Sequence, residues 1–245
     1  MVYEAVLCPQ CGQGESVYRH GTTRDGTSRY RCVACCRCFQ AAYINRAYLP
    51  GCAEQIEAMA LNGSGIRDTA RVLQISAQTV MRKLKKKIEC INEQPPVNPN
   101  YCAGHTPDLK LYADEMWSYV GAKKQQRWLW WVEDAASGEV VAFVFGRRTN
   151  DTFQRLLQAL KQADLQAVKW ITDAWAAYTT CLPAEEHQID KPQLQRLERK
   201  HLTLRTRVKR LTRKTICFSK LLFFHDGIIS LFIHHFFFKS VVASG

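Results

Sequence analysis

The chain has 245 residues, long enough for one large domain or for a small module joined to a domain of ordinary size. Its 34 Lys and Arg outnumber its 22 Asp and Glu, which gives a formal net charge of +12. The basic excess is concentrated in residues 82–87 and 196–214. This clustering favours a polyanionic partner, most simply nucleic acid, over a basic protein that has no such partner.

The eleven cysteines do not predict a secreted protein held together by disulfides. Six of them lie in the first 38 residues, and the chain begins Met-Val-Tyr-Glu-Ala-Val, with neither the basic nor the apolar region of a signal peptide. We therefore expect a reducing, cytoplasmic compartment and thiols that bind metal.

One segment, Leu221–Phe238, is nearly apolar and long enough to raise the possibility of a membrane anchor. It contains three histidines and Asp226, however, and an aspartate at that depth costs roughly 2.5 to 3.5 kcal/mol on insertion scales. A buried core helix is the better prediction, and no membrane partner is expected.

The first 50 residues have the spacing of a zinc ribbon. Two Cys-x-x-Cys pairs are separated by twenty residues that include a turn between Gly21 and Gly26. Four free core cysteines are the alternative, but the segment has few Leu, Ile or Val to form a core, so a bound Zn²⁺ is expected to fold it. Cys36 and Cys38 leave the fourth ligand open, and Cys35 is preferred because it mirrors the first pair. The candidate zinc ligands are Cys8, Cys11, Cys32 and Cys35.

Residues 51–90 are typical of a helix-turn-helix unit. Helices are expected over 54–62, 66–73 and 77–88, and Ser76 is a natural N-cap for the third. A helical hairpin that merely packs on another domain is the alternative. The third helix carries residues that could meet base edges (Gln78, Thr79, Arg82) and, further along, lysines suited to phosphates (Lys83, Lys86, Lys87). Four prolines and no periodicity make 91–107 a linker.

The remaining residues predict an α/β domain. Strands are expected over 109–121, 127–134 and 139–145. A helix capped by Asn150 or Asp151 should follow and run to Ala163. After it we expect a strand ending at Asp173, a strand near 187–189 and a helix from Leu194. Short connections make the first three strands antiparallel.

Two acids in this domain have unusual surroundings. Asp173 follows a short apolar strand, at the position where α/β sheets gather their chemistry. Glu198 is the single acid among nine Lys and Arg in residues 196–214, which suggests a bound metal or polyanion. The plainer interpretation is an acid in the first turn of a helix on a basic surface. Asp114 lies in the first strand, and Glu115 beside it is expected to face solvent.

The order of elements resembles the RNase H-like fold. The strings ADEMWSYVGAKKQQRWLWW, VVAFVFGRRT, WITDAWAAY and QRLERKHLTLR are similar to those of the insertion sequence one (IS one) transposase family, over roughly residues 8–220. Two departures are His201, where relatives have Asn, and Ala174, where Gly often follows the second acid. The resemblance implies a DDE triad of Asp114, Asp173 and Glu198.

The expected organisation is therefore a zinc-ribbon module (1–50), a helix-turn-helix module (51–90), a linker (91–107) and an RNase H-like catalytic domain (108–245). Three mutually repelling carboxylates need cations between them, so Mg²⁺ or Mn²⁺ is expected at the triad. Two such ions would promote attack of a water or 3′-hydroxyl on a phosphodiester. The cations expected to hold DNA phosphates here are Lys191, Arg199, Lys200 and Arg205.

The resemblance implies a DNA transposase of a prokaryotic insertion element. It would bind terminal inverted repeats in double-stranded DNA, then cut and join strands as at least a homodimer. Two alternatives stay open at this point: a DNA-binding repressor whose inactive C-terminal domain only oligomerises, and an RNase H-like nuclease that cuts without joining.

Overall fold

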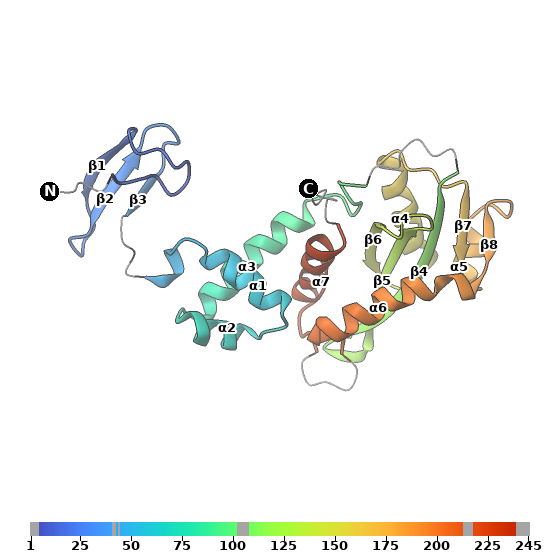
Figure 1. Ribbon diagram of the computed structural model, residues 1–245. Coiled ribbons are helices and arrows are strands. Elements are labelled where there is room, and N and C mark those ends of the chain that lie inside the picture. The colour runs from blue at the N-terminus through green and yellow to red at the C-terminus, as the bar shows by residue number, and fades with distance from the viewer. Residues whose placement is uncertain (1–4, 41–42, 44, 102–107, 213–217, 239–245) are drawn as a thin grey trace. The chain divides into compact units, whose positions relative to one another are not determined.

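A computed structural model describes residues 5–40, 43, 45–101, 108–212 and 218–238 (Figure 1). It divides into two compact units, residues 1–57 with 66–83 and residues 58–65 with 84–245.

The N-terminal part is a small antiparallel sheet of β1 (Val17–Thr22), β2 (Ser28–Cys32) and β3 (Cys38–Gln40), in the order β1-β2-β3. Gly26, with a φ of 77°, closes the turn between β1 and β2 in a conformation that side chains disfavour. Among the described residues of this part, the buried cluster consists of Cys8, Cys32 and Phe39, with partly buried neighbours. Such a small apolar core cannot stabilise the sheet by itself.

A short 3₁₀ helix, η1 (Arg46–Tyr48), precedes three helices: α1 (Cys52–Leu61), α2 (Ile66–Leu73) and α3 (Ala77–Asn92). The backbone N–H of Thr79 donates to Ser76 Oγ at 3.1 Å, which confirms the predicted N-cap. The third helix ends at Asn92, four residues later than its predicted end at Ile88. Ile88 is buried, and no proline interrupts the chain before Pro95.

The second sheet has five strands in the order β6-β5-β4-β7-β8. The strands are β4 (Lys110–Val120), β5 (Ala122–Asp134), β6 (Val140–Gly146), β7 (Lys169–Thr172) and β8 (His187–Ile189). The first three are antiparallel, whereas β7 runs parallel to β4 and β8 parallel to β7. The prediction that β5 begins at Arg127 is wrong. The strand begins at Ala122, directly after Gly121 at a φ of 75°, and before Arg127 the ladder with β4 includes Gln126 and, across an irregularity, Ala122.

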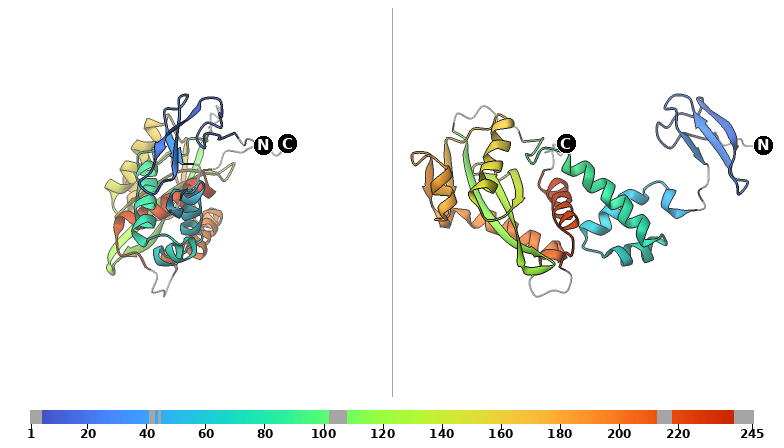
Figure 2. Two further views of the ribbon diagram at one scale, coloured as in Figure 1. Left: turned by 90° about the vertical axis from the view of Figure 1, so that its left-hand side faces the viewer. Right: turned by 180° about the vertical axis from the view of Figure 1, so that it is seen from behind.

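Helices cover both faces of this sheet (Figure 2). On one face α4 (Asn150–Gln162) and α5 (Ala176–Cys181) pack against Leu111 and Trp130. On the other lie α6 (Gln195–Arg207), flanked by the 3₁₀ helices η2 (Lys191–Leu194) and η3 (Lys209–Leu211), and α7 (Leu222–Phe236). The predicted cap of α4 at Asn150 or Asp151 is wrong, because both residues are inside the helix and Thr149 is the cap.

Part of the predicted linker belongs to this domain. Residues 91–92 continue α3, and Val97 forms an antiparallel bridge with Ala142 of the edge strand β6. The backbone N–H of Asn98 donates to Val141 O at 2.8 Å, and its side-chain amide donates to Val140 O at 3.1 Å. The segment therefore protects hydrogen-bonding groups on an exposed sheet edge, a role that the proline content concealed.

The C-terminal helix α7 is a buried core helix, as predicted. Residues 227–233 are buried, and His225 lies between two hydroxyls, with Nε2 at 2.9 Å from Ser118 Oγ and Nδ1 at 3.0 Å from Ser219 Oγ. Asp226 is paired with Arg127 at 2.5 Å. Among the residues that the structure describes, no helix has the length and apolar character needed to span a membrane.

A buried carboxylate on β5 attaches α6 to the sheet. Glu133 has a side-chain exposure of 0% and accepts from Arg196 Nε at 2.5 Å and from Lys200 Nζ at 2.6 Å. The same two cations donate to backbone carbonyls around the β5–β6 turn: Arg196 to Asp134 and Ala135, and Lys200 to Gly138. Two residues one helical turn apart thus fix both the position and the rotation of α6.

We predict that Glu133→Gln lowers the free energy of unfolding by about 3 kcal/mol, because two cations lose the carboxylate that compensates them in a largely buried site. Urea denaturation of the full chain measures this change. Glu185→Gln is the control, since Glu185 is exposed and its replacement should change stability by less than about 0.5 kcal/mol. Equal stability of the two variants would show that the ion pair does not hold α6 in place.

Candidate catalytic, metal and DNA-binding sites

The structure brings together the four predicted thiols. The Sγ atoms of Cys8, Cys11, Cys32 and Cys35 all lie within 4.8 Å of one another. Two of the distances, Cys8 to Cys35 and Cys11 to Cys32, are 3.6 Å. A disulfide would require about 2.05 Å, whereas a tetrahedral ion with Zn–S bonds of about 2.3 Å separates its sulfurs by roughly 3.8 Å. The spacing fits a zinc site.

The electrostatics of the cluster also favour a cation. Burial opposes ionisation of Cys8, yet hydrogen bonds from the backbone N–H groups of Cys11 and Gln10 lower its pKa to about 6. The pKa of Cys35 rises to about 12, since burial and the neighbouring thiols outweigh a backbone hydrogen bond from Arg37. Four thiolates at this distance need a bound cation to coexist.

We predict that Cys35→Ser reduces bound zinc from one ion per chain to well below one, whereas Cys36→Ser retains it. Cys36 is the matched control because it is adjacent in sequence but exposed and outside the cluster. Elemental analysis of the purified full chain gives the stoichiometry. If Cys36→Ser loses zinc and Cys35→Ser keeps it, the fourth ligand has been misassigned.

Asp114 and Asp173 come from neighbouring parallel strands. Tyr112 of β4 and Ile171 of β7 form the last pair between the two strands, and Asp114 and Asp173 each lie two residues beyond it. Side chains alternate along a strand, and Leu111 and Trp170 point into the core beneath α4 and α5. Asp114 therefore belongs to the opposite face, which α6 covers, and Asp173 directly follows the end of β7.

Helix α6 brings the third acid to this face. Its buried residues are Leu197, His201 and Leu204, and at 100° per residue Glu198 lies on the flank opposite Arg196 and Lys200. Those two cations reach toward Glu133 on β5, so Glu198 lies on the flank of α6 that does not face Glu133. Glu198 is exposed.

A histidine on the same helix lies directly against Asp114. His201 is buried, and its Nδ1 is 3.5 Å from Asp114 Oδ2. Its ring packs edge-on against Trp131, and among the described residues its Nε2 has no hydrogen-bond partner. The backbone N–H of Trp175 donates to Asp173 Oδ1 at 2.9 Å, which orients the second carboxylate.

The donor atoms fit a hard divalent cation in kind, because Mg²⁺ and Mn²⁺ prefer carboxylate oxygens. The three carboxylates are less tightly gathered than the thiols. Within the described ranges, only the cysteines form a group of three or more candidate ligands within 4.8 Å.

Glu115 was expected to face solvent, and this expectation is wrong. Its side chain is only 2% exposed and points into the core beneath α4 and α5, opposite to Asp114. Arg148 pairs with it at 2.5 Å, and Tyr178 Oη donates to it at 2.6 Å. Burial raises the pKa of Glu115, and burial together with the charge of Glu115 raises the pKa of Tyr178 well above its usual value. The alternation of β4 could have shown that adjacent acids point to opposite faces.

Arg148 is also enclosed by two aromatic rings. Its guanidinium lies 4.9 Å from the ring centre of Trp128 and 4.6 Å from that of Trp175. Trp175 also packs against Trp130 and Tyr178. These contacts give Trp175 a structural role in the domain interior, and no signal in the sequence identified Arg148 as its partner.

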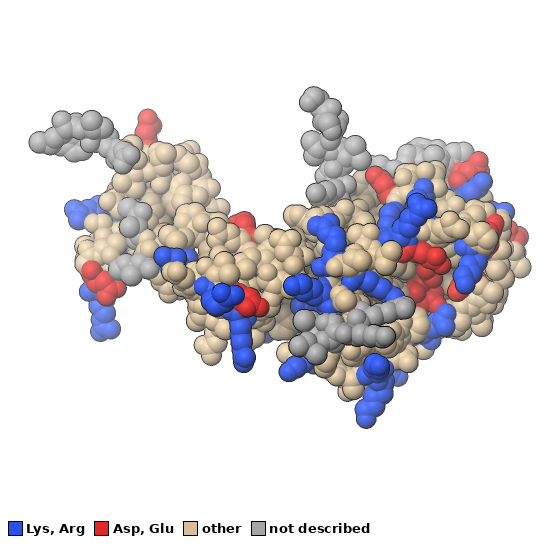
Figure 3. Space-filling model, turned by 60° about the horizontal axis from the view of Figure 1, so that its bottom comes forward, with Lys and Arg blue, Asp and Glu red and all other residues tan. Residues whose placement is uncertain are grey.

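The predicted phosphate-binding residues of this domain have different environments. Lys200 is only 21% exposed and is committed to Glu133, so its assignment as a phosphate contact is corrected. Arg205 is half-buried and donates to Trp117 O at 3.4 Å, whereas Lys191 and Arg199 are exposed. A space-filling view shows numerous Lys and Arg side chains around a smaller group of Asp and Glu (Figure 3).

All six predicted DNA-contacting residues of the helix-turn-helix lie on α3. Four of them are exposed: Gln78, Arg82, Lys86 and Lys87. Lys83 is half-buried, and the Thr79 hydroxyl lies 2.9 Å from Ser76 Oγ at the N-terminus of the helix.

The chain combines a three-helix unit with an α/β domain, and the family models define the class of protein as a polynucleotidyl transferase-type enzyme. Residues 110–239 match the family model described as IS1 transposase, and residues 43–87 match the InsA C-terminal domain, a helix-turn-helix module. The chain belongs to the IS1 transposase family and is a transposase with a DDE domain.

The chain is similar in sequence to proteins of IS1 elements. The chain is 38% identical over 156 residues to the InsB protein of an IS1 element from Escherichia coli K12, covering 64% of this chain and 87% of that protein. It is 43% identical over 120 residues to the iso-IS1n InsB protein of Shigella dysenteriae, covering 49% and 90%. The HTLV-2 integrase catalytic core, solved with magnesium in a trimeric form, overlaps with a TM-score of 0.34 and 16% identity, covering 54% of this chain and 86% of that one.

Proposed function

We propose that residues 108–245 form an RNase H-like domain whose catalytic triad is Asp114, Asp173 and Glu198. The sheet order supports this, with three antiparallel strands and two further strands parallel to the first. The observation that supports the proposal most is that Asp114, which lies against His201 of α6, and Asp173 each follow the last β4–β7 pair by two residues. Asp114 lies on β4, the first strand of this sheet in the chain, and Asp173 directly follows β7, the fourth strand. Glu198 lies on the later helix α6.

The three carboxylates would hold Mg²⁺ or Mn²⁺, which would activate a water or a 3′-hydroxyl and stabilise the leaving oxygen. The protein's own residues set the geometry. His201 holds Asp114 from the helix side, the Trp175 N–H orients Asp173, and the Glu133 ion pairs fix the rotation of α6 and hence the direction of Glu198. No covalent intermediate with the enzyme is needed.

The DNA substrate would be held in two ways. Helix α3 would read the terminal inverted repeats with Gln78 and Arg82, while its later lysines and the zinc ribbon position the module on the duplex. Near the triad, Lys191, Arg199 and Arg205 would neutralise phosphates. Cutting and joining two element ends requires at least a dimer of the chain.

We predict that Asp114→Asn, Asp173→Asn and Glu198→Gln each reduce strand transfer in Mg²⁺ at least about a hundredfold, because each change removes a charged ligand of the reacting site. Glu198→Gln should bind element ends as tightly as the original chain, or more tightly, in the absence of metal, since it removes a negative charge beside DNA. The assay follows end cleavage, joined product and end binding separately.

Glu185→Gln is the control, because it also removes one exposed acid from this domain. Normal strand transfer by Asp173→Asn would refute the triad. Cleavage without joined product in the unaltered chain would instead identify a nuclease, and end binding without either reaction a repressor.

A further inference from the structure

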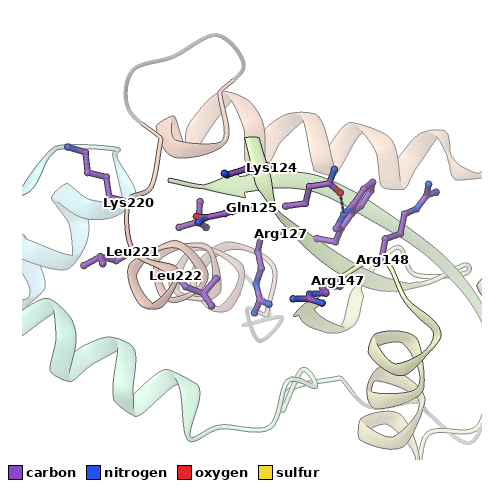
Figure 4. A pocket seen from close by; sticks show the side chains of 11 residues that line it. Lys124, Gln125, Arg127, Arg147, Arg148, Lys220, Leu221 and Leu222 are labelled. Carbon is purple, nitrogen blue, oxygen red and sulfur yellow. Dashed lines mark hydrogen bonds between the residues drawn. The ribbon is translucent and has the colours of Figure 1, made fainter. Parts of the chain in front are cut away.

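A basic pocket of about 740 Å³ lies where the β4–β5 hairpin, the segment after β6 and the start of α7 meet. Its lining includes Leu221, Leu222 and Trp128. No Asp or Glu lines it among the described residues. Figure 4 shows that the lining cations come from three segments of the chain. The five cations are Lys124, Arg127, Arg147, Arg148 and Lys220.

Two of these cations already have carboxylate partners behind the pocket wall. Arg127 is paired with Asp226, and Arg148 with the buried Glu115. In the described parts of the chain, no ion pair or side-chain hydrogen bond is recorded for Lys124, Arg147 or Lys220, all of which are exposed. The pocket therefore has three uncompensated positive charges on a framework that the two ion pairs hold in place.

Like charges brought into one concave site repel each other unless an anion binds there, and a cleft lined by one sign of charge concentrates its counter-ion. The lining also includes the aromatic ring of Trp128 and two exposed leucines, which phosphates alone do not require. A groove that combines cations with an aromatic side chain suits a single nucleic-acid strand, whose phosphates and unstacked bases are both accessible. A duplex would present mainly its phosphates.

The pocket is linked to β4, the strand that carries Asp114. Trp128 is paired with Trp117 on β4, three residues from Asp114, or about 10 Å along the strand. Arg148 joins the pocket wall to Glu115, the neighbour of Asp114. Trp128 and Glu115 lie on the face of the sheet opposite to Asp114, so both links are made from that face.

We propose that this pocket binds an unpaired DNA strand. The inference rests on the proposed function for the identity of the strand, but binding itself requires neither metal nor chemistry. It assigns a DNA contact to residues outside α3, η2 and α6, which hold the other proposed contacts.

The test uses the full chain without divalent metal, a labelled oligothymidine and, separately, a labelled duplex of the element end, with fluorescence anisotropy over a salt series. The pocket variant combines Lys124→Gln, Arg147→Gln and Lys220→Gln. The control combines Lys110→Gln, Lys123→Gln and Lys161→Gln, which remove the same charge from exposed positions outside the pocket. Lys123 is adjacent to Lys124 on β5 and so controls for local effects on the strand.

The pocket variant should bind the oligothymidine at least about tenfold more weakly than the control. The slope of log affinity against log salt should become shallower by about 2, because each of the three lost single-strand contacts contributes roughly 0.7. Its affinity for the duplex end should equal that of the control. Equal binding of the oligothymidine by the two variants would overturn the proposal, and so would an equal loss for the duplex. Absence of strand transfer in the unaltered chain would refute the proposed function and leave this binding result intact.

Discussion

The arrangement of the candidate catalytic face depends on one buried carboxylate. Glu133 cannot remain ionised in the interior without compensation, and Arg196 and Lys200 provide it from a helix that crosses the sheet. Because the two cations share one flank of α6, they fix its rotation on the sheet. Glu198 lies on the other flank of the helix, so its direction depends on an ion pair formed by its neighbours in sequence.

The two faces of the same sheet carry residues with different roles. Asp114 and Glu115 are adjacent, yet alternation sends Asp114 to the face under α6 and Glu115 into the core. Arg148 then compensates Glu115 between two tryptophan rings and continues into the wall of the basic pocket. Two adjacent residues of β4 therefore connect the candidate catalytic face with the core and with the wall of the basic pocket.

Much of this fold follows from local patterns in the sequence. The paired thiols, the Ser76 cap and the strand ending at Thr172 are set by residues close together in the chain, so spacing was sufficient to predict them. The partner of Lys200 was not predictable in this way. Its carboxylate is 67 positions away, and a lysine in a basic run looks the same whether it contacts phosphate or a buried acid. The docking of Val97 on β6 was concealed for the same reason.

The central claim is that Asp114, Asp173 and Glu198 act on one reacting site. Crystals of the full chain grown with Mn²⁺ test it most directly, since anomalous scattering locates manganese independently of activity. The account predicts manganese bound by oxygens of all three carboxylates, with His201 still against Asp114. Manganese bound elsewhere on the chain, with none at these three carboxylates, would contradict it.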